Sequence, residues 1–278
     1  MARVLCLTLS PLSARIALAA LIMIGLVALL GPYVSPYAYD EIVGGPFQGI
    51  SAHHWLGTDY LGRDTFARFL YGGRTLLLIA VLATSLAYVI AVPIGILSGL
   101  RRGAFDVALM AASDIVYALP PAIFLLVLLA ATGPSLVTII CGLVFLHVPR
   151  VLRIVRLITV DTSKSEYVEA ALTRGEGWVA ISFRDILPNI LPPVLADFGV
   201  RLCGSIILYA SLSYLGLGLP PPAADWGTMM SENRIAITIS PWIAIAPALA
   251  IATFSVSANI LADSFARSVG RSRRAGND

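Results

Sequence analysis

Residues 75–99 read Thr75-Leu-Leu-Leu-Ile-Ala-Val-Leu-Ala-Thr-Ser-Leu-Ala-Tyr-Val-Ile-Ala-Val-Pro-Ile-Gly-Ile-Leu-Ser-Gly99, and none of them carries a charge. The hydrocarbon core of a bilayer is about 30 Å thick, and about 20 mostly apolar residues cross it as a helix. This stretch therefore predicts a transmembrane helix. The whole chain agrees, because 58% of its 278 residues are hydrophobic and only 13% are charged, which lies outside the soluble range. We expect an all-α polytopic membrane protein.

Five more stretches of similar length and composition surround this one. The first of them begins after Arg15, as a signal peptide would, but it is longer than a signal-peptide core and lacks a small-x-small cleavage site. We therefore count it as a membrane span. The six predicted transmembrane helices cover residues 16–34, 75–99, 107–131, 135–152, 196–219 and 242–262.

Basic residues set the predicted orientation, because short cytoplasmic loops retain Lys and Arg. With a cytoplasmic N-terminus, fourteen of the 19 basic residues fall inside, four fall outside and Arg201 lies within a span. Both termini are therefore expected in the cytoplasm. The inside set is Arg3, Arg15, Arg101, Arg102, Arg150, Arg153, Arg156, Lys164, Arg174, Arg184, Arg267, Arg271, Arg273 and Arg274, and the outside set is Arg63, Arg68, Arg74 and Arg234.

Two connections between the spans are long enough to have structure or function of their own. No repeat of 20 to 50 residues and no low-complexity stretch divides the chain, so we expect one membrane domain. The predicted parts are the N-terminus with the first helix (1–34), an external loop (35–74), the transmembrane domain (75–263) with a cytoplasmic loop (154–195), and a cytoplasmic tail (264–278).

The cytoplasmic loop contains Ser163-Lys-Ser-Glu-Tyr-Val-Glu-Ala-Ala-Leu-Thr-Arg-Gly175, which has the pattern of a short capped helix. Ser163 and Glu166 are spaced as a capping box, and Gly175 can adopt the positive φ of a C-terminal cap. A second short helix is predicted over 179–187, ended by Pro188. A helix this short is marginal alone, so it packs either into a groove on a partner or against its own membrane spans.

Part of this loop resembles a known signature. Glu169-Ala-Ala-Leu-Thr-Arg-Gly175, followed by Ile186-Leu-Pro-Asn189, is similar to the E-A-A-x-x-x-G motif of permease subunits in binding-protein-dependent ABC importers. The resemblance implies a coupling helix that sits in a cleft of a cytoplasmic ATPase subunit. The implied docking residues are Glu166, Tyr167, Glu169, Ala170, Ala171, Arg174 and Gly175.

Further motifs extend the resemblance over about residues 53 to 263 and narrow it to the second permease of dipeptide, oligopeptide and nickel importers. They are His54-Trp-Leu-Gly-Thr-Asp59, Leu61-Gly-Arg-Asp64, Asp114-Ile-Val-Tyr-Ala-Leu-Pro120, Glu166-Tyr-Val-Glu-Ala-Ala171, Ser211-Leu-Ser-Tyr-Leu-Gly-Leu-Gly218 and Asp225-Trp-Gly227. The chain departs from that group at Asp185, at Tyr209 and in the tail after Asp263. These differences bear on which solute is carried.

The resemblance implies a type I ABC importer permease fold in a bacterial cytoplasmic membrane. Peptides are the implied cargo, with nickel chelates, glutathione or another small solute as alternatives. The implied partners are a second, homologous permease that completes a heterodimer, two cytoplasmic ATPase subunits, an external solute-binding protein and membrane lipid. An ATP-driven closure of the ATPases would then move the spans between inward-facing and outward-facing states.

Catalytic and metal chemistry is not expected in this chain. Lys164 is the only lysine, and no G-x-x-x-x-G-K-[ST] phosphate loop surrounds it, so ATP and magnesium are expected on partner subunits. His53, His54 and His147 form no i, i+4 pair and have no cysteine neighbours, so no metal site is predicted. The net charge of +3 gives no reason to expect a nucleic-acid partner.

Polar and backbone-breaking residues inside the spans are candidates for the translocation path, because charges in a bilayer are costly. Asp114 precedes Pro120 and Pro121, which should kink the third span. Asp197 and Arg201 form an i, i+4 pair that would anchor a helix end. Gly216 and Gly218 end the fifth span either as a gate or as a simple terminus. The predicted path residues are Asp114, Pro120, Gly216 and Gly218.

The role of the external segments also has two possible interpretations. A mixed-charge stretch of the long loop would form either a docking surface for a binding protein or an interfacial helix on the membrane; its residues are Trp55, Asp59, Arg63, Asp64, Arg68 and Arg74. Trp226 and Trp242 are predicted to be interfacial anchors. An ion-driven secondary transporter is the main alternative function, but it would call for inverted repeats and several buried acids, and Asp114 is the one clear acid.

Overall fold

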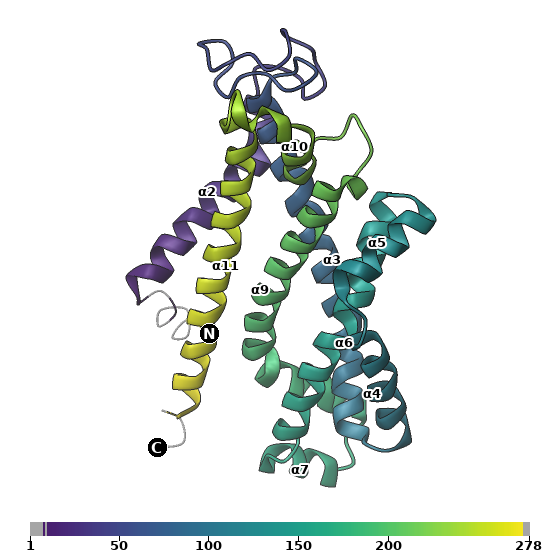
Figure 1. Cartoon of the computed structure of the whole chain (residues 1–278). Coiled ribbons are helices and arrows are strands. Elements are labelled where there is room, and N and C mark those ends of the chain that lie inside the picture. Colours follow the sequence, from purple (N-terminus) through teal and green to yellow (C-terminus); the bar gives the residue numbers. More distant parts are fainter. Residues whose placement is uncertain (1–7, 9, 275–278) are drawn as a thin grey trace.

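The computed structural model describes residue 8 and residues 10–274, and the part it describes is helical without a named strand. Figure 1 shows an elongated bundle with the external loop at one end and α7 at the other. The elements are α2 (Leu12–Val34), α3 (Thr65–Arg101), α4 (Ala104–Tyr117), α5 (Pro121–Thr132), α6 (Leu136–Thr162), α7 (Glu166–Thr173), α8 (Trp178–Ala180), the π-helix η1 (Ile181–Ile186), α9 (Leu187–Leu212), the π-helix η2 (Ser213–Leu217), α10 (Trp226–Glu232), the 3-10 helix η3 (Arg234–Thr238) and α11 (Trp242–Arg274).

Five helical stretches within the described residues are long and apolar enough to cross a membrane. A sixth span is obtained when α4 and α5 are counted together, although they are bent by 81° at their junction. The junction contains Pro120 and Pro121, whose missing N–H groups interrupt the helical hydrogen bonds. The predicted kink in the third span is confirmed, and it is sharp enough to break the helix.

A line of small residues lets α3 lie directly against α6. Ala83, Ala87, Ala91, Gly95 and Gly99 recur at every fourth position of α3, and all five are buried. A side-chain carbon at Gly95 would lie 2.9 Å from Cβ of Val155, and one at Gly99 would lie 2.8 Å from Cβ of Thr159. Small residues at this spacing allow helix backbones to approach closely inside a bilayer, where packing replaces the hydrophobic effect as the driving force.

The outer half of the bundle is organised around Trp226, the first residue of α10. Its side chain is fully buried, its Nε1 donates to the carbonyl of Phe69 at 2.8 Å, and its ring stacks on that of Phe69. The prediction that Trp226 anchors at the membrane interface is therefore wrong, because α10 folds back onto α3. Trp242 has a side chain that is about half exposed, as an interfacial anchor requires.

The external segment 35–64 contains no helix and is held by a buried set of charges, so the interfacial helix is excluded there. Arg63 donates to Asp59 at 2.7 Å, and both Arg63 and Arg68 donate to Glu232 of α10, at 3.2 and 2.9 Å. We call Asp59, Arg63, Arg68 and Glu232 the outer charge cluster. Asp59, Arg63 and Arg68 are at most 5% exposed, so these predicted docking charges face the chain itself.

His54 and Asp64 tie the same loop to the start of α3. The Asp64 carboxylate accepts from the backbone N–H of Ala67 at 2.7 Å, which caps α3, and it lies 2.9 Å from Nδ1 of His54. Of the remaining predicted docking residues, Trp55 and Arg74 are exposed. The loop is thus a fixed cap over the outer ends of the spans.

We predict that Gly73→Ala destabilises the protein, because the added Cβ would lie 2.4 Å from Cζ2 of the buried Trp226 ring. Overpacking of this kind costs about 1–3 kcal/mol. Gly25→Ala is the matched control, since a Cβ there meets nothing within 4 Å. Thermal unfolding of the purified protein in detergent measures the difference. Equal midpoints for the two variants would contradict the packing described for Trp226.

A second prediction concerns the outer charge cluster. Glu232→Ala leaves the buried Arg68 guanidinium with only Asp59, at 3.6 Å, and breaking a buried ion pair costs about 3–5 kcal/mol. We expect the loop to detach, so that trypsin cleaves after Arg63 at least about tenfold faster than in the wild type. Glu41→Ala, which changes an exposed acid of the same loop, should leave the cleavage rate unchanged. Slow cleavage of both variants would show that the cluster does not hold the loop.

Candidate functional site

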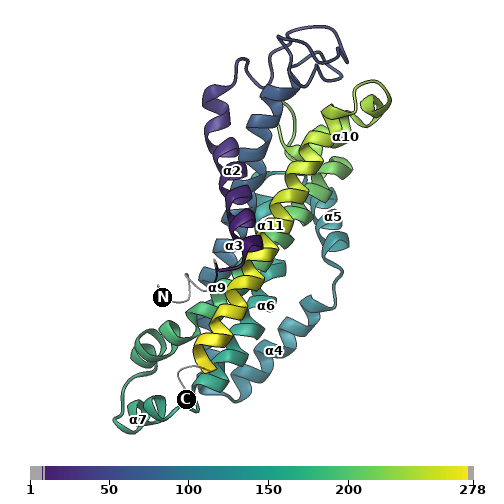
Figure 2. The same cartoon turned by 90° about the vertical axis from the view of Figure 1, so that its left-hand side faces the viewer.

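The strongest candidate site is the helix α7, which protrudes at the end of the bundle opposite the loop 35–64 (Figure 2). Val168 and Ala171 on one face of α7 have no exposed surface and belong to an apolar cluster. That cluster joins residues of α3, α6, η1 and α9, including Val155, Ile181 and Ile186. The short helix is therefore held by its own chain, which is one of the two alternatives for how it could be stabilised.

The opposite face of α7 is exposed. Most of the predicted docking residues lie there or just after it and are exposed: Glu166, Tyr167, Glu169, Ala170, Arg174 and Gly175. Ala171 differs, since its side chain is fully buried against its own chain and cannot face a partner. The structure thus brings six of the seven predicted residues to one exposed surface, which we call the α7 surface.

Gly175 ends α7 as the sequence predicted. Its φ is +75°, a conformation that glycine adopts without strain. The backbone N–H of Glu176 donates to the carbonyl of Ala171 at 3.2 Å, and that of Arg174 donates to Ala170 at 3.0 Å. The bond from Glu176 is the six-residue closure of a Schellman motif. It fixes the direction in which the chain leaves the α7 surface.

The beginning of α7 differs from the prediction. Ser163 is not its cap, because α6 continues to Thr162 and the Ser163 N–H still donates to Thr159, at 2.8 Å. The Ser163 hydroxyl donates to Val160 at 2.9 Å, within the end of α6. Helix α7 starts instead after Ser165, whose carbonyl accepts from Val168 and Glu169. The prediction of a capping box at Ser163 and Glu166 is therefore wrong, although the predicted short helix is present as α7.

Pro188 does not end the second short helix that was predicted after α7. The predicted short helix at 179–187 is the start of a continuous helical stretch, Trp178–Leu217, formed by α8, η1, α9 and η2. Pro188 lies in the first turn of α9, where a missing N–H costs little. The π-helix η1, whose turns are wider than those of an α-helix, lies between Pro188 and the residues of α8. The segment after α7 is thus continuous with the fifth span.

The predicted path residues lie at two separate breaks in the helices. Asp114 is largely exposed and forms an ion pair with Arg153 of α6, whose guanidinium lies over the Tyr117 ring. Pro120 precedes α5 at the break in the third span. Asp114 is therefore neutralised within the chain, and a role in the path stays a prediction. Asp197 and Arg201 form the expected ion pair at 3.2 Å.

Gly216 and Gly218 lie at the second break, where η2 meets α10. Gly216 has a φ of +84°, and a Cβ on Gly218 would lie 2.1 Å from Oγ of Ser213. The Ser213 hydroxyl donates to Asp225 at 2.7 Å. Burial raises the pKa of Asp225, and the hydrogen bonds that it accepts from Ser213 and Gly227 act in the opposite direction. These contacts terminate the helix, and gating by the glycines stays a prediction.

Sequence reasoning missed one buried ion pair at the inner end of the bundle. Arg156 of α6 donates through Nε and an Nη atom to both carboxylate oxygens of Asp106 in α4, each at 2.5 Å. Ser98 of α3 donates to the same carboxylate at 2.5 Å. Asp106 is 5% exposed. This contact joins α3, α4 and α6. The sequence feature that could have indicated it is an acidic residue, Asp106, directly before an apolar stretch.

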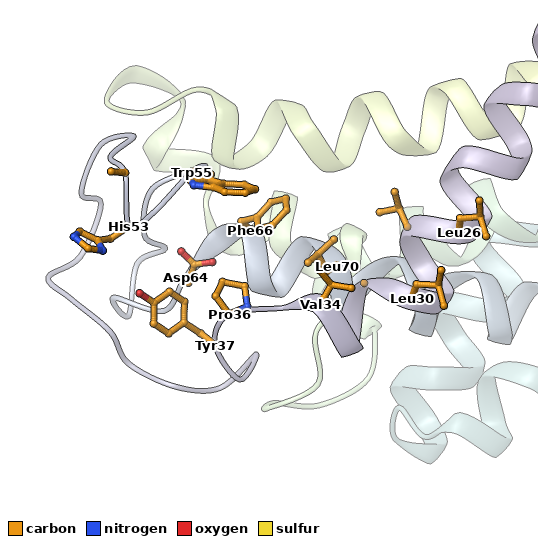
Figure 3. A pocket seen from close by; sticks show the side chains of 13 residues that line it. Leu26, Leu30, Val34, Pro36, Tyr37, His53, Trp55, Asp64, Phe66 and Leu70 are labelled. Carbon is orange, nitrogen blue, oxygen red and sulfur yellow. The ribbon is translucent and has the colours of Figure 1, made fainter.

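An apolar pocket of about 580 Å³ lies beneath the external loop. Figure 3 shows its walls, formed by Leu30 and Val34 of α2, Trp55 of the loop, and Phe66 and Leu70 of α3. The one carboxylate in its lining belongs to Asp64, which is already hydrogen-bonded to Ala67 and His54. The lining is otherwise mostly apolar, with His53 and Tyr37 at the loop side, so the pocket mainly offers apolar contact. Among the described residues, no group of His, Cys, Asp and Glu is arranged to hold a metal.

Comparison with known proteins agrees with this architecture. Residues 91–271 match the family described as binding-protein-dependent transport system inner membrane component. The chain is 34% identical to the glutathione transport system permease protein GsiD of Pectobacterium atrosepticum, over 85% of this chain and 79% of the relative. It is also 34% identical to a Brucella suis protein named for a peptide transport system permease, over 90% of this chain and 85% of the relative.

The family match runs from the second half of α3 into α11 and includes α7. The chain is a multi-pass membrane permease that belongs to the binding-protein-dependent transport system inner membrane component family.

Proposed function

We propose that this chain forms part of the translocation path of an ATP-driven peptide importer and that the α7 surface docks on a cytoplasmic ATPase subunit. One observation supports the proposal most strongly. The side chains of Tyr167, Glu169 and Ala170 are exposed on one face of α7, while the other face is buried against the rest of the chain. A helix held in this way can transmit displacement from a partner to α3, α6 and α9. The small side chain of Ala170 leaves room for close approach of a groove.

The proposed assembly includes subunits that differ from this chain. ATP and magnesium would bind two partner ATPase subunits, which the lack of a phosphate-binding loop in this sequence supports. A second, homologous permease completes the path as a heterodimer, and a solute-binding protein docks on the external cap. The chain lies in the bacterial cytoplasmic membrane with both termini inside, as the distribution of Lys and Arg favours.

Peptides are the proposed cargo, supported by the motifs at residues 53–227 and by the name of the Brucella suis relative. Glutathione, itself a peptide, is the second candidate because five of the similar relatives bear its name. Mass spectrometry of the solute that co-purifies with the binding protein decides between them. A carried nickel chelate or sugar would contradict both.

We predict that Ala170→Trp weakens docking of the ATPase, because a large ring on the α7 surface prevents a groove from closing around it. The ATPase recovered with the affinity-purified permease should fall by at least about tenfold, which corresponds to about 1.4 kcal/mol of lost binding. Membrane insertion should be unchanged, since Ala170 is exposed. Quantitative immunoblotting of the purified complex measures the effect.

The matched control is Ala104→Trp, the same change at an exposed alanine that begins α4. It should retain the ATPase. Equal recovery of the ATPase with both variants would contradict the docking role of the α7 surface.

A further inference from the structure

A second pocket lies at the break in the third span, inside the membrane region. Its volume is about 290 Å³, and this open pocket is lined by the start of α5, the middle of α6 and the middle of α9. The polar residues of its lining are His147, Arg150, Arg201 and Ser211, and no acidic residue takes part. Non-helical backbone at membrane depth is tolerated where it lines a cavity or is buried in protein. We call this cavity the α5–α6–α9 pocket.

Arg150 is the unusual member of the pocket. It forms no ion pair or hydrogen bond with any of the described residues, and its guanidinium lies 5.5 Å from the centre of the Tyr117 ring. Arg201 shares its charge with Asp197, at 3.2 Å, and Asp197 lies outside the pocket lining. The charge pattern of the sequence assigned Arg150 to the cytoplasmic side, but the structure places it in the middle of α6, beside the start of α5. An unpaired cation in a membrane-spanning helix is costly, and such residues mark ligand pathways. The pocket therefore presents positive charge to a ligand.

His147 supplies a second unsatisfied group. Its side chain is 2% exposed, and its Nε2 lies 2.8 Å from Oγ of Ser205, which in turn lies 2.8 Å from Oγ1 of Thr84. Its Nδ1 is buried without a hydrogen-bond partner. This nitrogen has less than 1 Å² of accessible surface, so it lies behind the pocket wall, and a Cβ added at Gly204 of the lining would meet the ring carbon Cε1 of His147. The first turn of α5, at Pro121 and Ala122, adds the positive end of a helix dipole.

We infer that the α5–α6–α9 pocket binds a carboxylate of the transported solute, with Arg150 as the principal charged residue and Arg201 and His147 beside it. A guanidinium matches the two oxygens of a carboxylate in geometry and charge. The inference rests on the proposed function, because free peptides carry a C-terminal carboxylate. The site gives the path a preference for anionic groups that is separate from the selectivity of the binding protein.

Gly204 allows the site to be probed directly. It lies in the pocket lining, and a Cβ added there meets only Cε1 of His147, at 4.0 Å. In the full transporter complex, with the 3 native cysteines replaced by alanine, Gly204→Cys is labelled with sulfonatoethyl or trimethylammonioethyl methanethiosulfonate. The ratio of the two rates removes the effect of thiol ionisation, since one thiolate reacts with both reagents.

We expect the anionic reagent to be favoured and Arg150→Gln to lower the rate ratio by about tenfold. Arg150→Lys, which keeps the charge, should retain most of the preference. A ratio that Arg150→Gln leaves unchanged would overturn the inference. A preference found in phosphatidylcholine vesicles but lost in phosphatidylglycerol vesicles would identify a lipid headgroup as the occupant and would also overturn it.

Uptake of dialanine by the reconstituted complex separates the two proposals. With wild-type Arg150, uptake should proceed, and Arg150→Gln should slow it by about tenfold with the ATPase still bound. If the wild-type complex takes up no dialanine, the peptide assignment fails on its own, and the labelling ratio still decides whether the pocket is an anion site.

Discussion

The contact between α3 and α6 is the constraint on which the rest of the structure depends. Lipid tails are as apolar as leucine, so two helices in a bilayer gain little by burying large side chains and instead need close, even surfaces. Ala83, Ala87 and Ala91 with Gly95 and Gly99 give α3 such a surface. Because α3 starts at the external cap and α6 ends just before α7, this one contact links the two ends of the molecule.

Each end is fixed by a different kind of interaction, as its surroundings require. At one end, ion pairs among Arg63, Arg68 and Glu232 join the loop 35–64 to α10. At the other end, Val168 and Ala171 bury one face of α7 in an apolar cluster with the ends of the spans. Between them, the spans carry breaks at Pro120 and Gly216. A rigid scaffold with fixed ends and broken spans suits a protein that converts displacement by a partner into a change of access.

Features set by neighbouring residues were predictable from the sequence. The apolar stretches located the spans, the two prolines located the break in the third span, and Gly175 marked the end of α7 with its positive φ. Features set by distant residues were not. The burial of Trp226 depends on space left by Gly73, and Arg68 is neutralised by Glu232 far along the chain. Local pattern likewise assigned Ser163 to the wrong helix, because nothing nearby shows how far α6 extends.

We propose that the α7 surface touches the ATPase while α7 itself stays bound to its own chain. Replacing Tyr167, which is 44% exposed, by the photoreactive residue p-benzoylphenylalanine tests it with little change of shape. Irradiation of the assembled transporter should link position 167 to the ATPase subunit, whereas the same replacement at Phe105, an exposed aromatic of α4, should give no such product. Complexes that contain the ATPase but yield no adduct at position 167 would contradict the account.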